Sequence, residues 1–481
     1  MGLLEVGVEH TEIMVIGGGT AGCAAALAAA RGGRKTMLIE QLGFLGGWAT
    51  AALVNPFMSH RTSDGKPLVG GTFDELRNRL SKASGLLGNS FDAECMRFEL
   101  QEMLLEAGVR LRLHTMFESA RYARSGASEA SCTEAPDRTN GMLRGRKPPE
   151  AYRSIIIRTM SKSGVEEFEC DRLIDCSGDG DAAAALGARF EMGDADGLPQ
   201  AVTLMFDMGG VDLERVLAYV RDHPDQMRFP KLAPTADPAE LAKGVVSVAG
   251  YYDLVAEARA NGEYGAPGDL IFFIGRPRRG EVVFNTTHVG GIDGTNAEDL
   301  TRAEIEGRRQ MMSVAAFVRK YVPGFENAYL LRSPEHVGVR ETRRIVGDYV
   351  FSAEDVVEAR KFTDAICRLA YPVDIHSGKG SGYTRSEGKG AGRPNNAPPG
   401  DWYEIPYRCL LPAGLDNVLV AGRCVSSTQA GHGAIRIMPA CVAMGQAAGA
   451  AAALSLDQRV SAREVDVPAL LDVLRRQGAL V

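Results

Sequence analysis

Gly17, Gly19 and Gly22 have the spacing of a backbone turn that can hold a pyrophosphate group. An apolar run at 13–16 precedes them and an alanine-rich segment at 21–30 follows, which predicts a buried strand, a tight turn and a helix. In such a turn the first glycine permits the bend, the second lets a phosphate reach the backbone, and the third lets the helix pack on the sheet. The N–H groups at the helix start favour the phosphate charge. The predicted contact residues are Gly17, Gly19, Thr20, Ala21 and Gly22.

A second apolar run at 36–39 ends in Glu40, about 20 residues beyond the glycines. An acidic side chain at this place accepts hydrogen bonds from a ribose hydroxyl, and its charge would repel a 2′-phosphate, so NADP is disfavoured. The alternative is a glycine-rich turn that only joins a strand to a helix. We favour the dinucleotide site, because strand, helix, second strand and terminal acid occur in the required order.

The segment from Gln41 to Thr50 adds further glycines just past the acidic strand end, where an NAD domain usually begins another helix. This segment resembles the glutathione-reductase-like superfamily of FAD enzymes, in the branch of FAD-dependent oxidoreductases, which is distantly similar to fumarate reductase flavoproteins. The resemblance implies a loop beside the FAD pyrophosphate and isoalloxazine, whereas a surface loop of the same composition is the alternative. The implied contact residues are Gln41, Gly46, Gly47, Trp48, Ala49 and Thr50.

Two more segments share the resemblance. A strand at 172–175 enters a turn in which Gly178 and Asp179 match the family pattern, although Cys176 and Ser177 depart from it. Helix capping by Asp179 or Asp181 is the alternative for that turn. A strand at 108–115 implies an adenine contact near Phe117.

The last hundred residues give the other strong signal. A strand ends in Gly422 and Arg423, and a helix over 440–454 follows with Pro439 at its start. The resemblance implies that Ile437 and Met438, at the helix N-terminus, meet the flavin, where the helix stabilises the negative charge of its reduced form. A buried C-terminal helix capped by proline is the alternative. Noncovalent FAD is expected, because no His or Cys lies within 43–50.

The acid–base candidates are His376, His432 and Tyr403, with Arg343 as a substrate clamp. His376 opens a segment, 377–400, whose seven glycines are typical of a movable lid. Arg343 belongs to a cluster at 340–344 that could bind a substrate carboxylate in bidentate fashion, or could form a surface ion-pair network of little energetic weight. For each histidine, the alternative is a structural residue whose ring is hydrogen-bonded within the core.

These residues need a scaffold that brings distant segments together. We predict an α/β protein with a Rossmann-like FAD/NAD(P)-binding fold of the glutathione-reductase type and an inserted mixed-sheet substrate domain. The discontinuous FAD-binding domain would comprise 1–60, 90–198 and 404–481, and the substrate or cap domain 61–89 and 199–403. A helix is expected from about 93 to 107, and antiparallel strands at 270–275 and 281–288. Residues 122–152, poor in large apolar side chains, are expected to form a mobile excursion.

Composition sets the remaining limits. The 481 residues include 54 Lys and Arg against 61 Asp and Glu, a formal net charge of −7, which disfavours nucleic acid as a partner. Nine cysteines without a Cys-x-x-Cys pair predict reduced thiols and no metal site. No apolar stretch is long enough to span a bilayer, so we expect a cytoplasmic protein with a small-molecule partner, and the sequence leaves a homo-oligomer open.

The sequence thus predicts a cytoplasmic FAD-dependent oxidoreductase that transfers a hydride between a small organic substrate and noncovalently bound FAD. Two rivals are a flavin enzyme without net redox change, of the isomerase or lyase type, and an NAD-dependent dehydrogenase.

Overall fold

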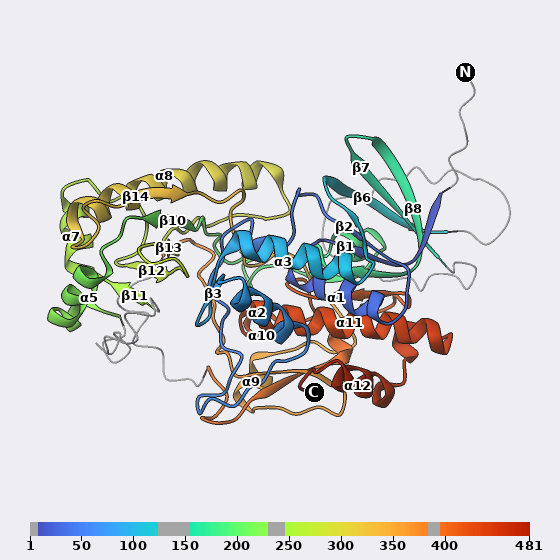
Figure 1. Cartoon of the computed structure of the whole chain (residues 1–481). Coiled ribbons are helices and arrows are strands. Elements are labelled where there is room, and N and C mark those ends of the chain that lie inside the picture. The colour runs from blue at the N-terminus through green and yellow to red at the C-terminus, as the bar shows by residue number, and fades with distance from the viewer. Residues whose placement is uncertain (1–7, 124–153, 229–245, 383–394) are drawn as a thin grey trace, which may run out of the picture.

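The main β-sheet joins strands from both ends of the chain. The computed structural model describes residues 8–123, 154–228, 246–382 and 395–481 and is drawn in Figure 1. Strand order is β5-β2-β1-β8-β7-β6, with β18 also paired to β8; β5, β2, β1, β8 and β18 run parallel, and β6, β7 and β8 form an antiparallel meander. The strands are β1 (Glu9–Ile16), β2 (Thr36–Ile39), β5 (Arg110–Arg112), β6 (Thr115–Tyr122), β7 (Ile155–Ser161), β8 (Gly164–Asp175) and β18 (Val418–Val420).

The register places the ends of the parallel strands in one row. Ile16 pairs with Ile39 on one side and with Asp175 on the other, and Asp175 pairs with Val420. The segments that follow β1, β2, β8 and β18 therefore leave the sheet side by side at its carboxyl edge, where open α/β sheets bind their ligands.

Both faces of this sheet are covered, which explains why its strands read as continuous apolar runs. Ile13 and Val15 face a core that includes α1 (Thr20–Arg31) and α11 (Met438–Gln458). Met14 and Ile16 face a separate core with α4 (Asp181–Ala185). Side chains alternate between the faces because neighbouring strand residues point in opposite directions.

Helices α1 and α11 pack against each other through small residues. A Cβ on Gly445 would lie 2.0 Å from the Ala21 carbonyl oxygen, and one on Gly449 would lie 2.1 Å from that of Ala25. The contacts advance in the same direction along both helices, so the helices are parallel. Among the described helices, α11 alone is long and apolar enough to cross a membrane, and 83% of its most apolar window is buried, as expected of a core helix.

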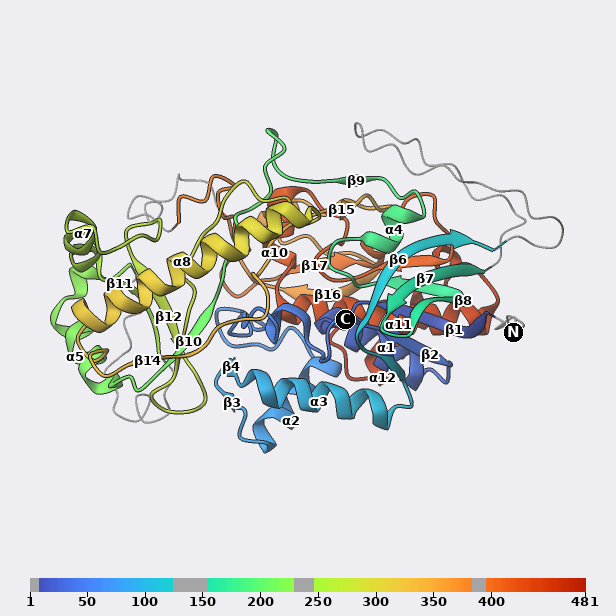
Figure 2. The ribbon, with the colours of Figure 1, turned by 90° about the horizontal axis from the view of Figure 1, so that it is seen from above.

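The second sheet lies at the other end of the molecule from β6, β7 and β8 (Figure 1). It is antiparallel with the order β11-β12-β13-β10-β14, and α8 (Ala297–Tyr321) runs from it toward β15 (Figure 2). The expected strand at 270–275 is present as β12, and the one expected at 281–288 is present as the shorter β13. The sheet strands are β10 (Phe206–Gly209), β11 (Ser247–Gly250), β12 (Ile271–Gly275), β13 (Val282–Phe284) and β14 (Tyr329–Arg332).

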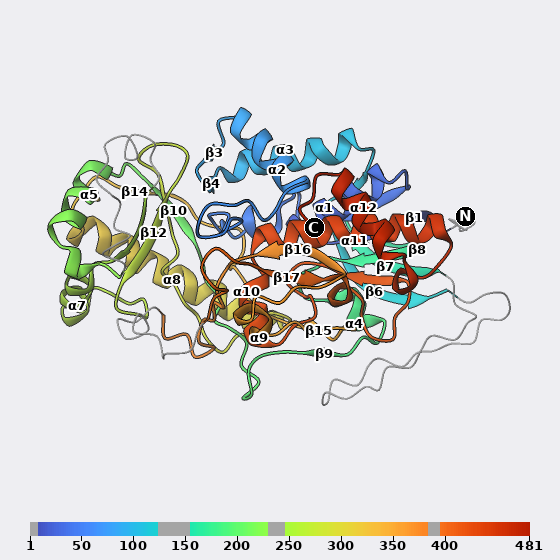
Figure 3. The same ribbon diagram turned by 90° about the horizontal axis from the view of Figure 1, so that it is seen from below.

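Smaller elements connect and flank the two sheets (Figure 3). The expected helix near 93–107 is present as α3, which the Asp92 carboxylate caps through the N–H groups of Glu94 and Cys95. The other helices are α2 (Thr72–Lys82), α3 (Ala93–Glu106), α5 (Leu213–Asp222), α7 (Tyr252–Ala260), α9 (Ala353–Val357), α10 (Gln429–Ile435) and α12 (Val467–Arg476). The other strands are β3 (Leu86–Leu87), β4 (Ser90–Phe91), β9 (Phe190–Glu191), β15 (Arg344–Ile345), β16 (Ala365–Leu369) and β17 (Tyr403–Pro406).

The packing differs from the predicted division of the chain at two places. Phe73 and Leu80 of α2, and the region from Phe351 to Tyr371, pack into the same core as α1 and α11, although the sequence suggested that they belong to the substrate domain. Their apolar faces cover this core rather than the second sheet, whose own core extends from Val202 to Val339.

Most of the expected mobile excursion at 122–152 and the middle of the expected lid at 377–400 lie outside the described residues.

Candidate functional site

The three glycines of the first turn have different roles: two are needed for close packing, and one leaves space open. A Cβ on Gly17, whose φ is +95°, would lie 2.5 Å from the Cys176 carbonyl oxygen, and one on Gly22 would lie 1.8 Å from that of Gly17. Gly19 is different, because its added Cβ would meet nothing nearer than the Cα of Gly47 at 3.9 Å. Its backbone is therefore open to a bound group. Gly19 is also the N-cap of α1, where no side chain caps the first N–H groups.

The second glycine loop lies directly on the first. Gly46 N–H donates to the Gly18 carbonyl oxygen at 2.8 Å, and a Cβ on Gly47 would come within 2.9 Å of the Gly19 Cα. Thr50 Oγ1 closes the loop by donating to the Leu45 carbonyl oxygen at 2.6 Å. The predicted contact residues of the two loops are thus brought together.

Glu40 anchors the end of β2 to both loops. Its Oε2 accepts Gly18 N–H at 2.6 Å and its Oε1 accepts Leu42 N–H at 2.8 Å. Burial raises the pKa of this carboxyl, while the N–H donors act to lower it. Phe117 lies nearby, because Thr115 N–H donates to the Glu40 carbonyl oxygen at 3.0 Å.

The turn after β8 is held by a residue that the sequence reading missed. Asp175, completely buried, accepts the N–H groups of Ser177 at 3.0 Å and Ala183 at 2.8 Å, so the alternative that Asp179 or Asp181 caps α4 is wrong. Asp179 instead accepts hydrogen bonds from Thr342 Oγ1 and Arg423 Nη2, each at 2.7 Å. Gly178 leaves room for this guanidinium group, since an added Cβ would lie 2.8 Å from Arg423 Nη2.

The start of α11 reaches beyond the start of α1. Gly445, seven residues after Met438, packs on Ala21, so α11 begins about 10 Å ahead of that contact at a rise of 1.5 Å per residue. Ile437 is its N-cap, and no side chain caps the first N–H groups. Gly422 reaches the start of α1, where its added Cβ would meet that of Ala21 at 3.0 Å.

These features fit a dinucleotide. Two helix N-termini offer N–H groups that no side chain of the described residues caps, and Gly19 keeps backbone space open between the glycine loops.

A buried cluster of histidines lies close to the start of α11. His376 Nδ1 is 3.2 Å from His288 Nε2, and His376 Nε2 is 3.6 Å from Asp374 Oδ2. Arg436, which directly precedes the N-cap of α11, donates through Nη2 to the Asp374 carbonyl oxygen at 3.2 Å. Gln200 Oε1 accepts His376 N–H at 3.0 Å, and its buried Nε2 has no hydrogen-bond partner within the part of the chain that the structure describes.

The pKa values of this cluster follow from burial and from two arginines. Burial, with a contribution from Arg340, lowers the pKa of His376 to about 4 and that of His288 well below its usual value. Burial acts to raise the pKa of Asp374, but His376, Arg436 and Arg340 together lower it. At neutral pH both imidazoles are therefore neutral and Asp374 is ionised.

In the arginine cluster at 340–344, Arg340 and Arg344 are buried and Arg343 is half-buried, and they point in different directions, which corrects the alternative of a surface network. Arg340 and Arg344 are 8% and 3% exposed. Arg340 Nη1 donates to the Ala201 carbonyl oxygen at 2.6 Å, near the histidines. Arg343 turns away, and its Nη1 lies 2.8 Å from Asp181 Oδ1. Burial and the Asp179 charge raise the pKa of Asp181 to about 6.

His432 and Tyr403, also predicted from sequence, are completely buried, and both contact backbone carbonyl oxygens. His432 Nε2 is 2.8 Å from the Arg423 carbonyl oxygen, and burial lowers its pKa well below the usual value. The Tyr403 hydroxyl lies 2.9 Å from the Tyr371 carbonyl oxygen and 3.0 Å from that of Ala434, and burial raises its pKa. Tyr403 thus holds the segment that carries His376 against α10.

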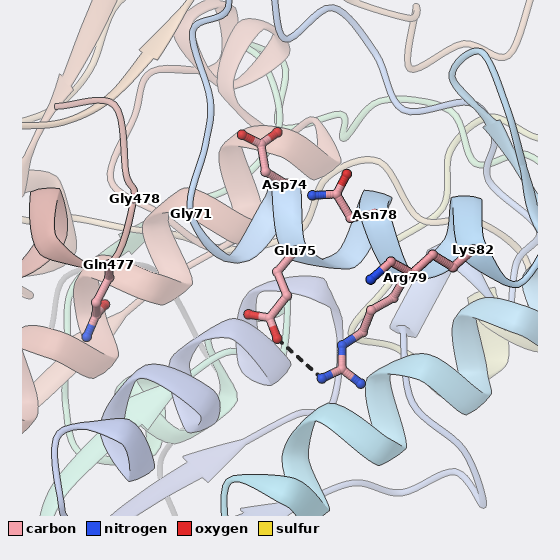
Figure 4. A pocket seen from close by; sticks show the side chains of 8 residues that line it. All are labelled: Gly71, Asp74, Glu75, Asn78, Arg79, Lys82, Gln477 and Gly478. Carbon is pink, nitrogen blue, oxygen red and sulfur yellow. Dashed lines mark hydrogen bonds and ion pairs between the residues drawn. The ribbon is translucent and has the colours of Figure 1, made fainter.

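A surface hollow of about 570 Å³ lies between α2 and the turn after α12 (Figure 4). Its lining includes Asp74, Glu75, Arg79 and Lys82, and no residue of the glycine loops or of the histidine cluster. Among the described residues, no group of three or more His, Cys, Asp or Glu side chains could hold a metal ion.

A parallel sheet with glycine loops and open helix N-termini along its carboxyl edge defines a dinucleotide-binding α/β protein. The chain belongs to the FAD dependent oxidoreductase family, whose model matches residues 12–474. It is an FAD-dependent oxidoreductase and its cofactor is FAD, which excludes the NAD-dependent dehydrogenase.

Solved structures are similar over most of the chain but at low identity. Aklavinone-11 hydroxylase, solved with FAD and aklavinone, is 12% identical with a TM-score of 0.39; the match covers 94% of this chain and 64% of that one. A geranylgeranyl bacteriochlorophyll reductase-like protein from Thermoplasma acidophilum is 11% identical over 98% and 83% of the chains, with a TM-score of 0.42. The p-nitrophenol 4-monooxygenase from Pseudomonas putida is 11% identical over 97% and 84%, with a TM-score of 0.40. These similarities carry no conclusion about substrate. No curated protein matches the sequence.

Proposed function

We propose that FAD lies noncovalently along the carboxyl edge of the main sheet, as in the glutathione-reductase type of fold, with its pyrophosphate at the start of α1 and its isoalloxazine at the start of α11. The observation that carries this placement is the pair of parallel helices whose uncapped N-termini are offset by about 10 Å. Each end favours negative charge, that of the pyrophosphate at α1 and that of the reduced ring at α11.

The proposed FAD contacts are the residues that meet at this edge. They are Gly17, Gly19, Thr20, Ala21, Gly22, Glu40, Gln41, Gly46, Gly47, Trp48, Ala49, Thr50, Phe117, Gly178, Asp179, Gly422, Arg423, Ile437 and Met438. We propose that 202–339, with their own core, form the substrate domain.

When bound, FAD supplies a two-electron acceptor or donor, and the enzyme transfers a hydride between it and a small organic substrate. The protein must hold the substrate and manage its proton. His376 is the proposed acid–base residue, because it is neutral at neutral pH and lies in the cluster beside the start of α11.

The substrate carries a carboxylate in this proposal. Gln200 Nε2 and Arg436 Nε are buried N–H donors without partners among the described residues, and leaving such donors unsatisfied is costly. A carboxylate would accept from both, with the charge assistance that a guanidinium provides. The substrate clamp thereby moves from Arg343, which pairs with Asp181, to Arg436. A buried water at these donors is the competing explanation.

Two measurements on the purified protein test the proposal. The protein reconstituted with FAD should be yellow and retain the cofactor through gel filtration. Under anaerobic conditions, a panel of hydroxy acids and amino acids should include compounds that bleach the oxidised flavin spectrum, whereas the matching neutral amides should not. Loss of FAD would contradict its placement. Bleaching by the amides alone would contradict the carboxylate, and binding without bleaching would favour the flavin enzyme without net redox change.

A further inference from the structure

We infer that His288, His376 and Asp374 together hold a single exchangeable proton, so that the two imidazoles act as one acid–base group. The inference deepens the proposed function and rests on it for the role of His376. It adds His288 and Asp374 as positioning residues, which act through His376 rather than on the substrate.

The polar contacts form a continuous chain. It begins at the Thr286 carbonyl oxygen, 3.2 Å from His288 Nδ1. It continues from His288 Nε2 to His376 Nδ1 at 3.2 Å, and ends between His376 Nε2 and Asp374 Oδ2 at 3.6 Å. A carbonyl oxygen can only accept, so His288 Nδ1 carries a proton and the Nε2 of a neutral His288 is bare.

The two neutral imidazoles have no proton left for the contact between His376 Nε2 and Asp374. The two contacts at 3.2 Å are hydrogen bonds that each need one proton, and two neutral imidazoles carry two protons in total. The third contact, at 3.6 Å, becomes an ion pair only when His376 Nε2 carries a proton. If His376 donates from Nδ1 to His288, its bare Nε2 faces the Asp374 carboxylate. If His376 instead donates to Asp374, two bare nitrogens face each other at 3.2 Å. One added proton completes all three contacts.

A second added proton has no place in the chain. It would set the His288 Nε2–H against the His376 Nδ1–H at the same 3.2 Å, with two positive charges side by side. The pair therefore takes up one proton rather than two.

The charges around the two histidines determine whether the pair carries the extra proton at neutral pH. Arg340, from the segment before β15, and Arg436, at the end of α10, both act to lower the pKa of His376, whereas Asp374 acts to raise it. The Tyr371 hydroxyl donates to Asp374 Oδ2 at 3.2 Å and keeps that carboxylate in position. Burial and the arginines lower the pKa of His376 more than Asp374 raises it. The histidine pair therefore lacks its extra proton at neutral pH and can act as a base.

The role of the pair in the reaction follows from the absence of this extra proton at neutral pH. In the oxidising direction, an O–H or N–H bond of the substrate breaks and its proton goes to His376 Nε2. The electron pair of that bond stays on the substrate and forms the new double bond to carbon as the hydride leaves that carbon for FAD. The proton then completes the chain between Thr286 and Asp374, and the reverse direction returns it to the substrate.

The variant Asp374→Asn tests the proton count directly. The Asn amide can donate to His376 Nε2 and complete the chain with both imidazoles neutral, while its oxygen can still accept the Tyr371 hydroxyl. Ring ¹⁵N resonances of histidine-labelled, FAD-loaded protein report which nitrogens carry protons. In the wild type, His288 and His376 should share one proton gained on acidification to about pH 4, and in Asp374→Asn they should gain none over that range.

His288→Gln is the second variant, with a different signature. Its side-chain amide can donate to His376 Nδ1, so the His376 proton should move to Nε2, facing Asp374, at neutral pH. Asp171→Asn is the matched control, because Asp171 pairs with the exposed His10 at 3.3 Å and takes no part in the contacts between Thr286 and Asp374. It should leave the resonances of both buried histidines unchanged.

Three outcomes would overturn the inference: two separate one-proton transitions in the wild type, a proton on His288 Nε2 at neutral pH, or an Asp374→Asn titration like that of the wild type. The flavin absorption of each sample is recorded first. Protein without FAD that still shows the one-proton behaviour would refute the proposed function alone.

Discussion

Gly19 and Gly22 are three residues apart and have opposite surroundings, which makes them a matched pair. An added methyl group at Gly19 meets nothing nearer than 3.9 Å and requires no positive φ, so Gly19→Ala should fold with nearly unchanged apoprotein stability. The same group occupies the space proposed for the pyrophosphate. We expect the FAD dissociation constant to rise at least about tenfold, measured by fluorescence titration of the apoprotein, because one lost phosphate hydrogen bond costs about 1.5–3 kcal/mol.

Gly22→Ala should show the reverse order of effects. Its Cβ would lie 1.8 Å from the Gly17 carbonyl oxygen, so helix and turn must separate. Overpacking of this kind costs about 1–3 kcal/mol, which thermal unfolding of the apoprotein would detect. Equal loss of stability in the two variants would contradict the assignment of Gly19 to the cofactor.

The second sheet is tied to β4 by a buried ion pair and the hydrogen bond that its arginine donates. Arg276 Nη2 is 2.7 Å from Asp207 Oδ1, both side chains are at most 3% exposed, and Arg276 Nη1 donates to the Phe91 carbonyl oxygen at 3.1 Å. Arg332 Nη2 also pairs with Asp207, at 2.8 Å from Oδ2. The joint between the sheet and β4 therefore depends on one buried carboxylate and the two guanidinium groups around it.

Arg276→Ala should weaken this joint strongly. It would leave the Asp207 charge buried with only Arg332 to balance it, a loss of about 3 kcal/mol in the free energy of unfolding. Arg279→Ala is the control, since Arg279 and Glu214 are 65% and 79% exposed, and it should cost at most about 0.5 kcal/mol. A small effect of Arg276→Ala on the urea midpoint would show that packing, not this pair, joins the elements.

Elements were easier to predict than contacts between them. The periodic apolar runs and the glycine turn indicated β1, α1, β2, α3 and α11, because those signals are local in sequence. Asp175, Gln200 and Asp374 carried no such signal. Asp175 ends a strand whose aspartate looks like any turn residue, and Gln200 meets His376 only through folding across 176 residues of chain.

The arginine cluster shows the same limit. Five residues in a row, 340–344, suggested one clamp, yet Arg340 and Arg343 reach different sites, because neighbouring side chains of an extended segment point to opposite sides. The sequence could identify the residue types but not which of them faces the histidines.

Acid unfolding of the whole molecule should depend on buried neutral histidines. Burial and Arg77 lower the pKa of His60 to about 4, below the value near 6.5 of an unfolded chain. The unfolded state then binds more protons between these limits, so the stability that neutral His60 contributes is complete above pH 6.5 and is lost as the pH falls toward 4. Asp181, with its raised pKa, acts in the opposite sense, so a comparison between variants is needed.

His60→Gln should flatten the fall of stability with pH by at most about 1.4 kcal/mol per pH unit. Its amide can still accept a hydrogen bond from Arg77. His10→Gln, at an exposed histidine, is the control and should follow the wild type. Thermal melts from pH 7 to 4 compare the three proteins, and identical slopes would rule out His60 as a contributor.

The packing of α1 against α11 also determines when the protein can finish folding during synthesis. Helix α11, which packs on Ala21, emerges from the ribosome roughly 400 residues after α1, a delay of about 20 to 80 s at ordinary translation rates. Until then the small-residue face of α1 and the edge of β8 that β18 will occupy stay uncovered in the nascent chain. Chaperone protection should therefore be needed at the beginning of the chain, and flavin loading should begin only after translation has nearly ended.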